Sequence, residues 1–378
     1  MARRIPAVFM RGGSSKAVMF NASDLPESRE ERDALFLELM GSPDPYQRQL
    51  NGMGGGISSV SKVVIVEPSA RDDADVDYTF GQVTVDKPIV DYSATCGNMS
   101  SAVAPFAIDE RLVDVVADGT VTVRVFNTNT SKLYHAELEV KERVAVEVGD
   151  FTIPGVAGSG ALTTLSYLDP GGAATGKFLP SGNTVDELEV PGLGAVEMSL
   201  VDASNPIVFV EAARLGKTAT ERPEALDSDG DFMAKMEAIR RVGAVAMGLA
   251  DSVETVKLAN PKIAILGPAA DFESIDGASH KADNMDICVR IVSMEKVHRA
   301  VTLTGAMCLA AAAEVPGTIA NRLRRAGAEG APLRIGNASG VLPAKAEVRA
   351  LDEGGFEALS VTTYRTFRRL MEGNVLVR

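Results

Sequence analysis

The segment best suited to chemistry centres on a cysteine that precedes a run of small or apolar residues. Cys96 is followed by Gly97, Asn98 and a stretch over residues 99–108 that is free of charge until Asp109. Such a stretch predicts a buried helix, whose unpaired N–H groups and dipole would stabilise a thiolate at its start. A reactive cysteine is therefore one interpretation of Cys96. The other is an inert core residue, which is common for a lone cysteine.

A second run of this kind lies in the other half of the chain, over residues 301–313. A helix that is apolar on every side must be buried all round, and in a strand-rich domain it fits inside a strongly curved sheet. Two such domains would bring two helix N-termini toward one cleft, an arrangement that suits an anion. Two ordinary core helices with closely packed glycines are the alternative.

The composition limits the classes of function. With 378 residues, 46% of them hydrophobic, the chain can bury substantial cores, and its length favours two domains. The formal net charge of −13 argues against nucleic acid or an anionic membrane as a partner. The chain has three cysteines without close spacing, which favours a reducing cytoplasm over a disulfide scaffold. Its three histidines form no short-spaced cluster, so no metal site is predicted.

Short β-rich runs dominate the chain, and helices are sparse. Strands are predicted at residues 7–10, 17–20, 62–66, 77–85, 120–126, 134–140, 144–148, 188–190, 196–201, 207–210, 263–266 and 285–293. Besides the two apolar helices, we predict helices at 28–40 and 231–247. Residues 154–183 hold seven glycines and three prolines, which indicates an irregular crossover. We therefore predict one domain over 1–185 and another over 186–378, whose last strand is able to pack back on the first domain.

Several motifs, taken together and in this order, resemble one family. They are Arg11-Gly12-Gly13-Ser14-Ser15-Lys16, the stretch from Gln49 to Lys62 with its Gly54-Gly55-Gly56 loop, Cys96-Gly97-Asn98, Ser204-Asn205-Pro206, Thr304-Gly305-Ala306 and Arg368-Arg369-Leu370-Met371-Glu372-Gly373. The chain resembles the PrpF-like branch of the diaminopimelate epimerase-like fold, which contains 2-methylaconitate cis-trans isomerase, methylitaconate isomerase and 4-oxalomesaconate tautomerase. The resemblance runs nearly end to end. It implies an α/β (α+β) chain of two similar domains, each a curved, mostly antiparallel sheet or incomplete barrel around a central apolar helix, with one active site between them and no cofactor.

The chain departs from diaminopimelate epimerases at one catalytic position. Those enzymes use two opposed cysteines as base and acid. Cys96 matches the first cysteine, whereas alignment on Thr304-Gly305 puts Thr302 at the position of the second. A threonine hydroxyl is far too weakly acidic for proton exchange near neutral pH. Symmetric epimerisation therefore loses support, and proton transfer at two nearby carbons gains it.

Lys62 is the predicted partner of Cys96. It follows a loop rich in glycine and serine and directly precedes the apolar strand 63–66, so its ammonium starts on the scaffold. Partial burial, or a neighbouring cation such as Lys16 or Arg11, would lower the pKa of Lys62 and supply free amine. A surface lysine is the ordinary interpretation of such a residue. The resemblance implies a catalytic base.

These groups predict a cofactor-independent isomerase that acts on a small unsaturated di- or tricarboxylate such as 2-methylaconitate, 4-oxalomesaconate or methylitaconate. Lysine or a thiolate would remove an allylic proton, and an acid would return it two carbons along, or to the same carbon after rotation. The intermediate is dienolate-like, and catalysis depends on stabilising its charge. The sequence does not decide which of Lys62 and Cys96 removes the proton.

The predicted substrate-binding residues offer N–H groups, hydroxyls or positive charge from loops and helix starts. They are Arg11, Ser14, Ser15, Lys16, Gly54, Gly55, Gly56, Ser58, Ser59, Gly97, Asn98, Met99, Asn205, Thr302, Thr304, Gly305, Ser339 and Gly340. The last two match a His-Pro-Ser-Gly loop that is common in relatives. Asn337-Ala338 replaces His-Pro in this chain, which puts contacts from those two positions in doubt.

Two other functions stay open at this point. A cysteine-dependent hydrolase would need a histidine close to Cys96. A non-catalytic carboxylate-binding protein could use the same scaffold, because a fold alone does not establish chemistry. The predicted partner is a small unsaturated polycarboxylate, with no nucleic acid and no membrane, and neither a metal nor a cofactor is expected. The strand-rich domains are compatible with a homodimer.

Overall fold

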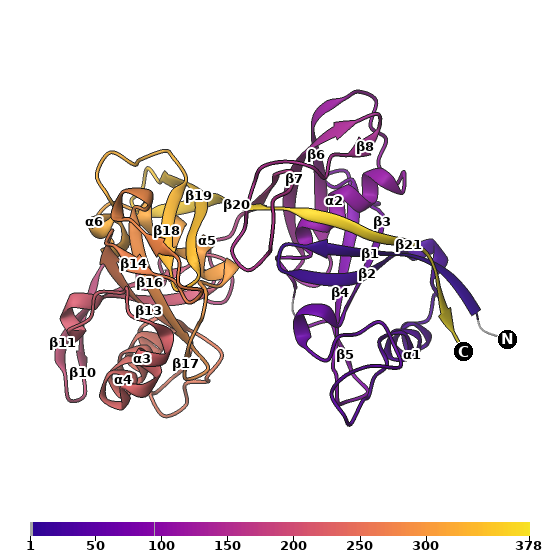
Figure 1. The fold of residues 1–378 in the computed structure, drawn as a ribbon. Helices are drawn as coiled ribbons and strands as arrows, with labels where there is room; N and C mark the ends of the chain where they lie inside the picture. Colours follow the sequence, from indigo (N-terminus) through magenta and orange to yellow (C-terminus); the bar gives the residue numbers. More distant parts are fainter. Residues whose placement is uncertain (1–2, 94) are drawn as a thin grey trace. The chain divides into compact units, whose positions relative to one another are not determined.

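The chain consists of two compact units in the computed structural model, which describes residues 3–93 and 95–378. Unit 1 comprises Met1–Tyr167 and Tyr364–Arg378, and unit 2 comprises Leu168–Thr363. Figure 1 shows the labelled elements of each unit. None of the helices described combines the length and the apolar character that a membrane crossing requires.

The observed division differs from the predicted boundary between residues 185 and 186. The segment from residue 168 to 185 belongs to unit 2 because its backbone is bonded there. The N–H of Gly172 donates to the carbonyl of Asp202 at 2.8 Å, and the N–H groups of Ala174 and Thr175 donate to the Asp202 carboxylate. The region predicted as irregular is also partly regular, because a strand begins at Thr163.

Unit 1 contains two main helices and a strongly hydrogen-bonded set of strands. Its elements are β1 (Arg3–Gly12), β2 (Ser15–Asn21), η1 (Ala22–Asp24), α1 (Arg29–Met40), η2 (Ser58–Val60), β3 (Lys62–Pro68), β4 (Val76–Val83), β5 (Val90–Asp91), α2 (Ser100–Asp109), β6 (Gly119–Asn127), β7 (Lys132–Lys141), β8 (Val144–Ala145), β9 (Thr163–Leu168), which ends at the unit boundary, and β21 (Phe367–Val377). The strand predicted at 144–148 is thus confined to its first two residues.

Unit 2 holds the remaining elements. They are β10 (Asp186–Val190), β11 (Gly194–Asp202), β12 (Pro206–Glu211), η3 (Ala212–Leu215), α3 (Pro223–Ser228), α4 (Gly230–Ala246), β13 (Lys262–Pro268), β14 (Phe272–Glu273), β15 (Ser279–His280), η4 (Ala282–Asn284), β16 (Ile287–Ser293), β17 (Lys296–Val297), α5 (Leu303–Ala313), α6 (Ile319–Leu323), β18 (Leu333–Asn337), β19 (Gly340–Ala350) and β20 (Phe356–Arg365), whose last two residues fall in unit 1.

The helix α2 forms the centre of unit 1. Nearly all of its residues are buried, and they pack in one core with apolar side chains from β1, β2, β3, β4, β6 and β7. Figure 1 shows α2 among these strands. The outer face of β1, β2 and β3 forms a second core with α1, which Ser28 caps at its start and the left-handed Gly41 ends. The sheet of unit 1 therefore carries one helix on each face.

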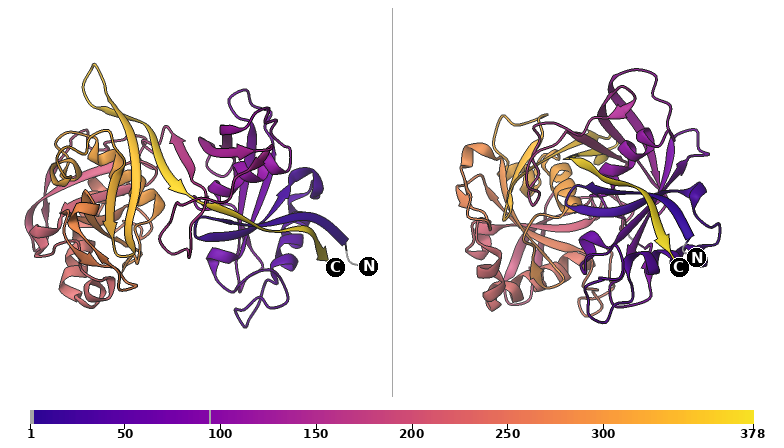
Figure 2. Two further views of the ribbon diagram at one scale, coloured as in Figure 1. Left: turned by 45° about the horizontal axis from the view of Figure 1, so that its top comes forward. Right: turned by 45° about the vertical axis from the view of Figure 1, so that its right-hand side comes forward.

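The C-terminal strand closes the sheet of unit 1. β21 pairs antiparallel with β1 from Arg3 opposite Val377 to Gly12 opposite Phe367, with a bulge at Phe9 and Met10. Both views of Figure 2 show β21 running alongside β1. Unit 1 is thus assembled from two separated segments of the chain.

The order and pairing of elements repeat between the units. In unit 1 the hairpin β1–β2 leads through α1 to β3, which is parallel to β2 and antiparallel to β4. After α2, β6 is parallel to β4 and antiparallel to β7. In unit 2 the elements β11, β12, α4, β13, β16, α5, β18 and β19 follow the same scheme. The buried helix α5 is therefore the counterpart of α2.

Candidate active site

Lys62 begins β3 and is largely buried, with 7% of its surface exposed. Its Nζ donates to Oε1 of Gln82 at 2.5 Å and lies 5.1 Å from the centre of the Phe80 ring. Within the described residues, no carboxylate pairs with Lys62 or acts on its pKa. Burial lowers the pKa of this lysine, and the thiolate form of Cys96 opposes the shift. The position therefore favours the neutral amine more than an exposed position would.

Gln82 positions the amine, although sequence reasoning did not identify it. It lies opposite Lys62 in the β3–β4 ladder. Its Nε2 donates to the carbonyls of Ser58 and Ser61 at 3.2 and 2.9 Å, which leaves Oε1 directed at the lysine. Only the strand register brings the two residues together, so no local motif could have revealed Gln82.

The glycine loop before Lys62 is shaped by Gln49, which is almost completely buried. The Gln49 amide accepts from Gly56 N–H at 2.9 Å and from the Ser61 hydroxyl at 2.6 Å, and it donates to Ser42 at 2.8 Å. The N–H of Gly54 donates to the carbonyl of Met40, the last residue of α1. The N–H groups of Gly54 and Gly56 thus bond within the protein, and substrate contacts from these two glycines stay predictions.

The half-buried Cys96 lies at the entrance to α2. Its thiol contacts the hydroxyl of the buried Ser15 at 3.9 Å, and its carbonyl accepts from the N–H of Ser100 at 3.0 Å. The β1–β2 turn packs directly on the next residues, since a Cβ added at Gly12 or Gly13 would collide with Asn98. The amide of Asn98 donates to Ser14 at 3.1 Å. The fold thus brings the Arg11–Lys16 motif next to the Cys96-Gly97-Asn98 motif.

Arg365 is a further member of this group that sequence reasoning missed. It is 7% exposed, its Nε donates to Oδ1 of Asn98 at 3.4 Å, and its Nη1 donates to the carbonyl of Tyr364 at 2.8 Å. Burial lowers its pKa, while anionic Tyr167 and Cys96 would raise it. None of the carboxylates in the described parts of the chain forms an ion pair with it. A buried guanidinium beside Cys96 and Asn98 favours an anion there.

The other predicted cations of unit 1 have local partners. Arg11 donates to the carbonyls of Gly13, Thr366 and Phe367 at 2.8 to 3.1 Å, which ties the β1–β2 turn to the start of β21. Lys16 lies over the ring of Phe9 at 5.5 Å. Substrate contacts from Arg11 and Lys16 stay predictions.

The rest of the predicted set in unit 1 is spread over these loops. Met99 is fully buried at the start of α2, so only its backbone is available to a ligand. Gly97 is half-buried between Cys96 and Asn98. Ser58 and Ser59 lie in η2, next to the Gln82 amide, and Gly55 packs against Val60. These contacts also stay predictions.

In unit 2, Thr302 caps α5. Its hydroxyl accepts from the N–H of Gly305 at 3.0 Å. The sequence offers this N–H to a ligand, whereas the structure shows it bonded within the chain. Thr304 is half-buried in the first turn of the helix. Asn205 accepts from Nζ of Lys262 at 3.0 Å. A cap is the observed role of the threonine that stands in the place of a second cysteine.

The 337–340 turn supports the residues before α5. Oδ1 of the buried Asn337 accepts from the N–H of Val301 and of Ser339 at 3.4 and 3.0 Å, and its Nδ2 donates to the carbonyl of Gly340 at 2.9 Å. The hydroxyl of Ser339 donates to the carbonyl of Arg299 at 2.6 Å. Gly340 has φ +125°, a conformation that glycine favours. Asn337 thus has a structural role in this chain.

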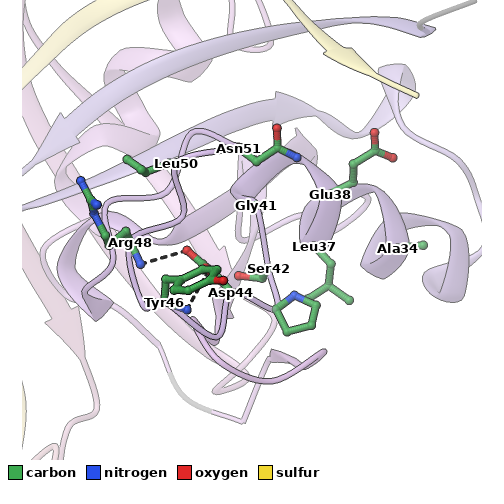
Figure 3. A pocket seen from close by; sticks show the side chains of 11 residues that line it. Ala34, Leu37, Glu38, Gly41, Ser42, Asp44, Tyr46, Arg48, Leu50 and Asn51 are labelled. Atoms are coloured by element: carbon green, nitrogen blue, oxygen red, sulfur yellow. Dashed lines mark hydrogen bonds between the residues drawn. The ribbon is translucent and has the colours of Figure 1, made fainter.

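Two further observations bear on the alternatives. The one histidine of unit 1, His135, acts electrostatically on Asp75, and a histidine partner for Cys96 is not found among the described residues of unit 1. A pocket of about 820 Å³ lies beside α1, where Asp44 accepts from the N–H groups of Tyr46 and Arg48 (Figure 3). None of the predicted site residues lines this pocket. The Cys96 group therefore remains the best candidate for catalysis.

Comparisons with known proteins bear on the family, the fold and the enzyme class of this chain. A family model described as "PrpF protein" matches residues 2–378. A 2-methyl-aconitate isomerase of Shewanella oneidensis is 39% identical over 99% of this chain and 97% of its own. A 3-methylitaconate isomerase of Eubacterium barkeri is also 39% identical, with the same coverage, and a (4E)-oxalomesaconate Delta-isomerase of Novosphingobium is 36% identical over 98% of this chain and 97% of its own.

A crystal structure of methylitaconate-delta-isomerase superposes with a TM-score of 0.92 at 39% identity, covering 100% of this chain and 96% of that one. The predicted resemblance, fold class and isomerase class are confirmed, whereas the roles of single residues stay predictions.

Proposed function

The chain belongs to the PrpF family, and we propose that it is an isomerase that moves a double bond, or changes its geometry, in a small unsaturated di- or tricarboxylate. Its relatives support this class of substrate, since they are named as isomerases of 2-methyl-aconitate, 3-methylitaconate and oxalomesaconate. Choosing among these acids requires direct assay.

The observation that carries the proposal is the environment of Lys62. Burial lowers the pKa of this lysine and its partner is a neutral amide, so the free amine is more accessible than in an exposed lysine. Such an amine removes the proton from an allylic carbon that a conjugated carboxylate or keto group makes acidic. Lys62 becomes an ammonium, and the electron pair of the broken C–H bond spreads into a dienolate.

Cys96 then returns a proton. Its thiol donates to the carbon two positions along the dienolate, or to the original carbon after rotation, and becomes a thiolate. The ammonium of Lys62 and this thiolate attract each other, as their mutual electrostatic influence indicates. Transfer of one proton from Lys62 to Cys96, directly or through water, restores the starting state, so the cycle needs no cofactor.

Arg365 and the entrance of α2 stabilise the intermediate. The negative charge of the dienolate resides on carboxylate oxygens, and the guanidinium of Arg365 lies within a hydrogen bond of Asn98. The amide of Asn98 and the N–H groups at the start of α2 add partial positive charge. These groups are in place before reaction, which is what electrostatic stabilisation requires.

Solvent exchange tests the proposal. We expect the enzyme in deuterated water to incorporate label at the allylic position of at least one acid from a panel of methylaconitate, methylitaconate, oxalomesaconate and aconitate, followed by proton NMR. Lys62→Met should abolish label incorporation, and Lys141→Met, an exposed lysine at the end of β7, should leave it unchanged. Normal exchange in Lys62→Met would refute the assignment of the base.

We also propose the cytoplasm as the compartment of this enzyme. Its three cysteines are free, and two of them are buried. The proposed proton donor, Cys96, must stay reduced to function, which a reducing compartment favours.

A further inference from the structure

The side chain of Asn129 takes the place of a strand neighbour for β4. Asn129 lies in the turn between β6 and β7. Its amide oxygen accepts from the N–H of Phe80 at 2.8 Å, and its amide nitrogen donates to the carbonyl of Phe80 at 2.8 Å. A paired strand would satisfy the same two backbone groups, which need partners when they are buried. The turn is therefore fastened to β4 through this one side chain.

The same amide also holds the chain that leads to Cys96. The second donor of the Asn129 amide, the last that an amide offers, bonds to the carbonyl of Tyr92 at 2.9 Å. Tyr92 precedes Cys96 by four residues. The ring of Phe80 lies 5.1 Å from Nζ of Lys62. One side chain thus connects a neighbour of the proposed base with the chain before the proposed proton donor.

Asn127, the last residue of β6, adds a second bond to this part of the chain. Its side chain is buried. Its amide oxygen accepts from the N–H groups of Asn129 and Thr130 at 3.0 and 3.2 Å, which shapes the turn. Its amide nitrogen donates to the hydroxyl of Thr95 at 2.5 Å, and Thr95 directly precedes Cys96. The turn between β6 and β7 therefore fixes the chain before the thiol at two points.

The other side of Cys96 is anchored to the start of α2. Its carbonyl accepts from the N–H and from the hydroxyl of Ser100 at 3.0 and 3.2 Å. Within the described residues, the amides of Asn127 and Asn129 bond neither to the amine of the base nor to the thiol. Any effect of these amides on proton transfer must therefore act through the geometry of the chain.

We propose that Asn127 and Asn129 are positioning residues that fix the place of the Cys96 thiol relative to the amine of the base. This inference rests on the proposed function, in which Cys96 returns the proton that Lys62 removes. Proton transfer needs the reacting atoms at contact distance, and a displacement of about 1 Å can slow a reaction by about 100-fold. A turn that only stabilised its hairpin would change the stability of the fold, but not the balance between the two proton transfers. That balance is therefore the property to measure.

Comparison of label exchange with isomerisation tests the proposal. Lys62 alone can remove an allylic proton and return a deuteron to the same carbon, whereas isomerisation also needs Cys96. Thr95→Val removes the hydroxyl that Asn127 binds and keeps the shape of the side chain. We expect its kcat for isomerisation to fall by about 10- to 100-fold, with label exchange and KM changed by less than about 3-fold. Thr95→Ser, which keeps the hydroxyl, should recover most of the loss.

A second variant and a control complete the comparison. Asn129→Ala should show the same pattern as Thr95→Val, although Asn129 lies in a different part of the chain. Asn284→Ala, at the exposed end of η4, is the matched control and should leave exchange and isomerisation unchanged. An equal fall of exchange and isomerisation in Thr95→Val, or no change in either, would overturn the proposal.

Two measurements without turnover separate this inference from the proposed function. By calorimetry, the affinity for tricarballylate, a saturated tricarboxylate, should change by less than about 3-fold in Thr95→Val, because a positioning residue does not touch the ligand. A larger loss of affinity would make Thr95 a binding residue and overturn the proposal. Iodoacetamide should label Cys96 at least about 3-fold faster in Thr95→Val and in Asn129→Ala, because the chain before the thiol is released.

The labelling rate keeps its meaning if the proposed function fails. If no acid exchanges label with solvent, the proposed function is wrong, yet faster labelling of Cys96 in Thr95→Val would still support the positioning role of the turn. Unchanged labelling would contradict that role. If Asn129→Ala does not fold, Thr95→Val still decides the question, because Thr95 is exposed and its replacement leaves the core intact.

Discussion

Lys62 and Gln82 are register partners on β3 and β4, and the lysine Nζ donates to the glutamine Oε1 at 2.5 Å. The partner is an amide where a structural lysine would more often meet a carboxylate. An amide oxygen orients the amine but adds no negative charge that would retain its proton. This pair therefore combines fixed geometry with a lowered pKa.

The neutrality of Gln82 is directly testable. Gln82→Glu would place a carboxylate beside Lys62 and raise the pKa of the lysine, because an opposite charge favours the ammonium form. We expect kcat/KM at pH 7 to fall by about 10- to 1,000-fold and to recover as the pH rises. Gln47→Glu, on an exposed loop, is the control. An unchanged pH profile in Gln82→Glu would exclude Lys62 as the base.

The lowered pKa of Lys62 also links stability to pH. The folded state holds the proton of Lys62 less tightly than the unfolded state, so the unfolded state binds more protons between the two pKa values. The wild type should therefore gain unfolding free energy relative to Lys62→Met as the pH rises from the folded pKa toward 10.5. Urea unfolding of both proteins at pH 7 and pH 10 measures this difference. If the wild type instead loses unfolding free energy relative to Lys62→Met between pH 7 and pH 10, the lowered pKa is contradicted.

Arg365 should matter for the reaction more than for the fold. Arg365→Met removes the buried guanidinium beside Asn98, and we expect kcat to fall by about 100- to 1,000-fold, as for the loss of one donor to a developing oxyanion. Arg368→Met, at a neighbouring exposed position, should retain activity. Equal activity of the two variants would assign Arg365 a purely structural role.

The thiols should differ in reactivity. Cys96 is half-buried, whereas Cys288 and Cys308 are almost fully buried. Iodoacetamide should therefore label Cys96 first, with activity lost in proportion, and tricarballylate should slow both. Peptide mass spectrometry identifies the labelled residue. Full activity of protein alkylated at Cys96 would remove this residue from the mechanism.

Gln49 should stabilise the glycine loop. Gln49→Leu leaves the partly buried N–H of Gly56 without its acceptor and removes one hydrogen bond each from Ser42 and Ser61, so we expect a loss of about 1–3 kcal/mol in unfolding free energy. Gln47→Leu, which is exposed, should cost much less. Chemical denaturation measures both. Equal stability of the two variants would mean that the loop holds its shape without this side chain.

Elements whose ends are marked by capping residues could be predicted from the sequence. The helix predicted at 28–40 is observed as Arg29–Met40, because Ser28 and Gly41 mark its ends by local capping chemistry. The two apolar helices are central because no face of either could be exposed. The strand predicted at 144–148 stops at Ala145, since its β-rich composition does not guarantee a pairing partner.

The site was predicted only where its residues form motifs. Lys62, Cys96 and Ser15 belong to recognisable segments, and their proximity follows from the fold. Gln82 and Arg365 have no local signature, because strand register and the return of the chain to unit 1 place them. The N–H groups of Gly54, Gly56 and Gly305 have acceptors within the fold for a related reason: a sequence shows which N–H groups exist, but not which carbonyl or side chain accepts them.

The return of β21 to β1 has a consequence for how the enzyme comes into being during translation. β21 emerges from the ribosome long after β1, and until then the edge of β1 that β21 covers stays unpaired. Arg365 arrives with that segment, after all of unit 2 has been synthesised. A nascent or prematurely terminated chain therefore carries Lys62 and Cys96 without the buried cation between Asn98 and Tyr364. The cation that we propose to stabilise the intermediate therefore joins the site only after unit 2 has been synthesised.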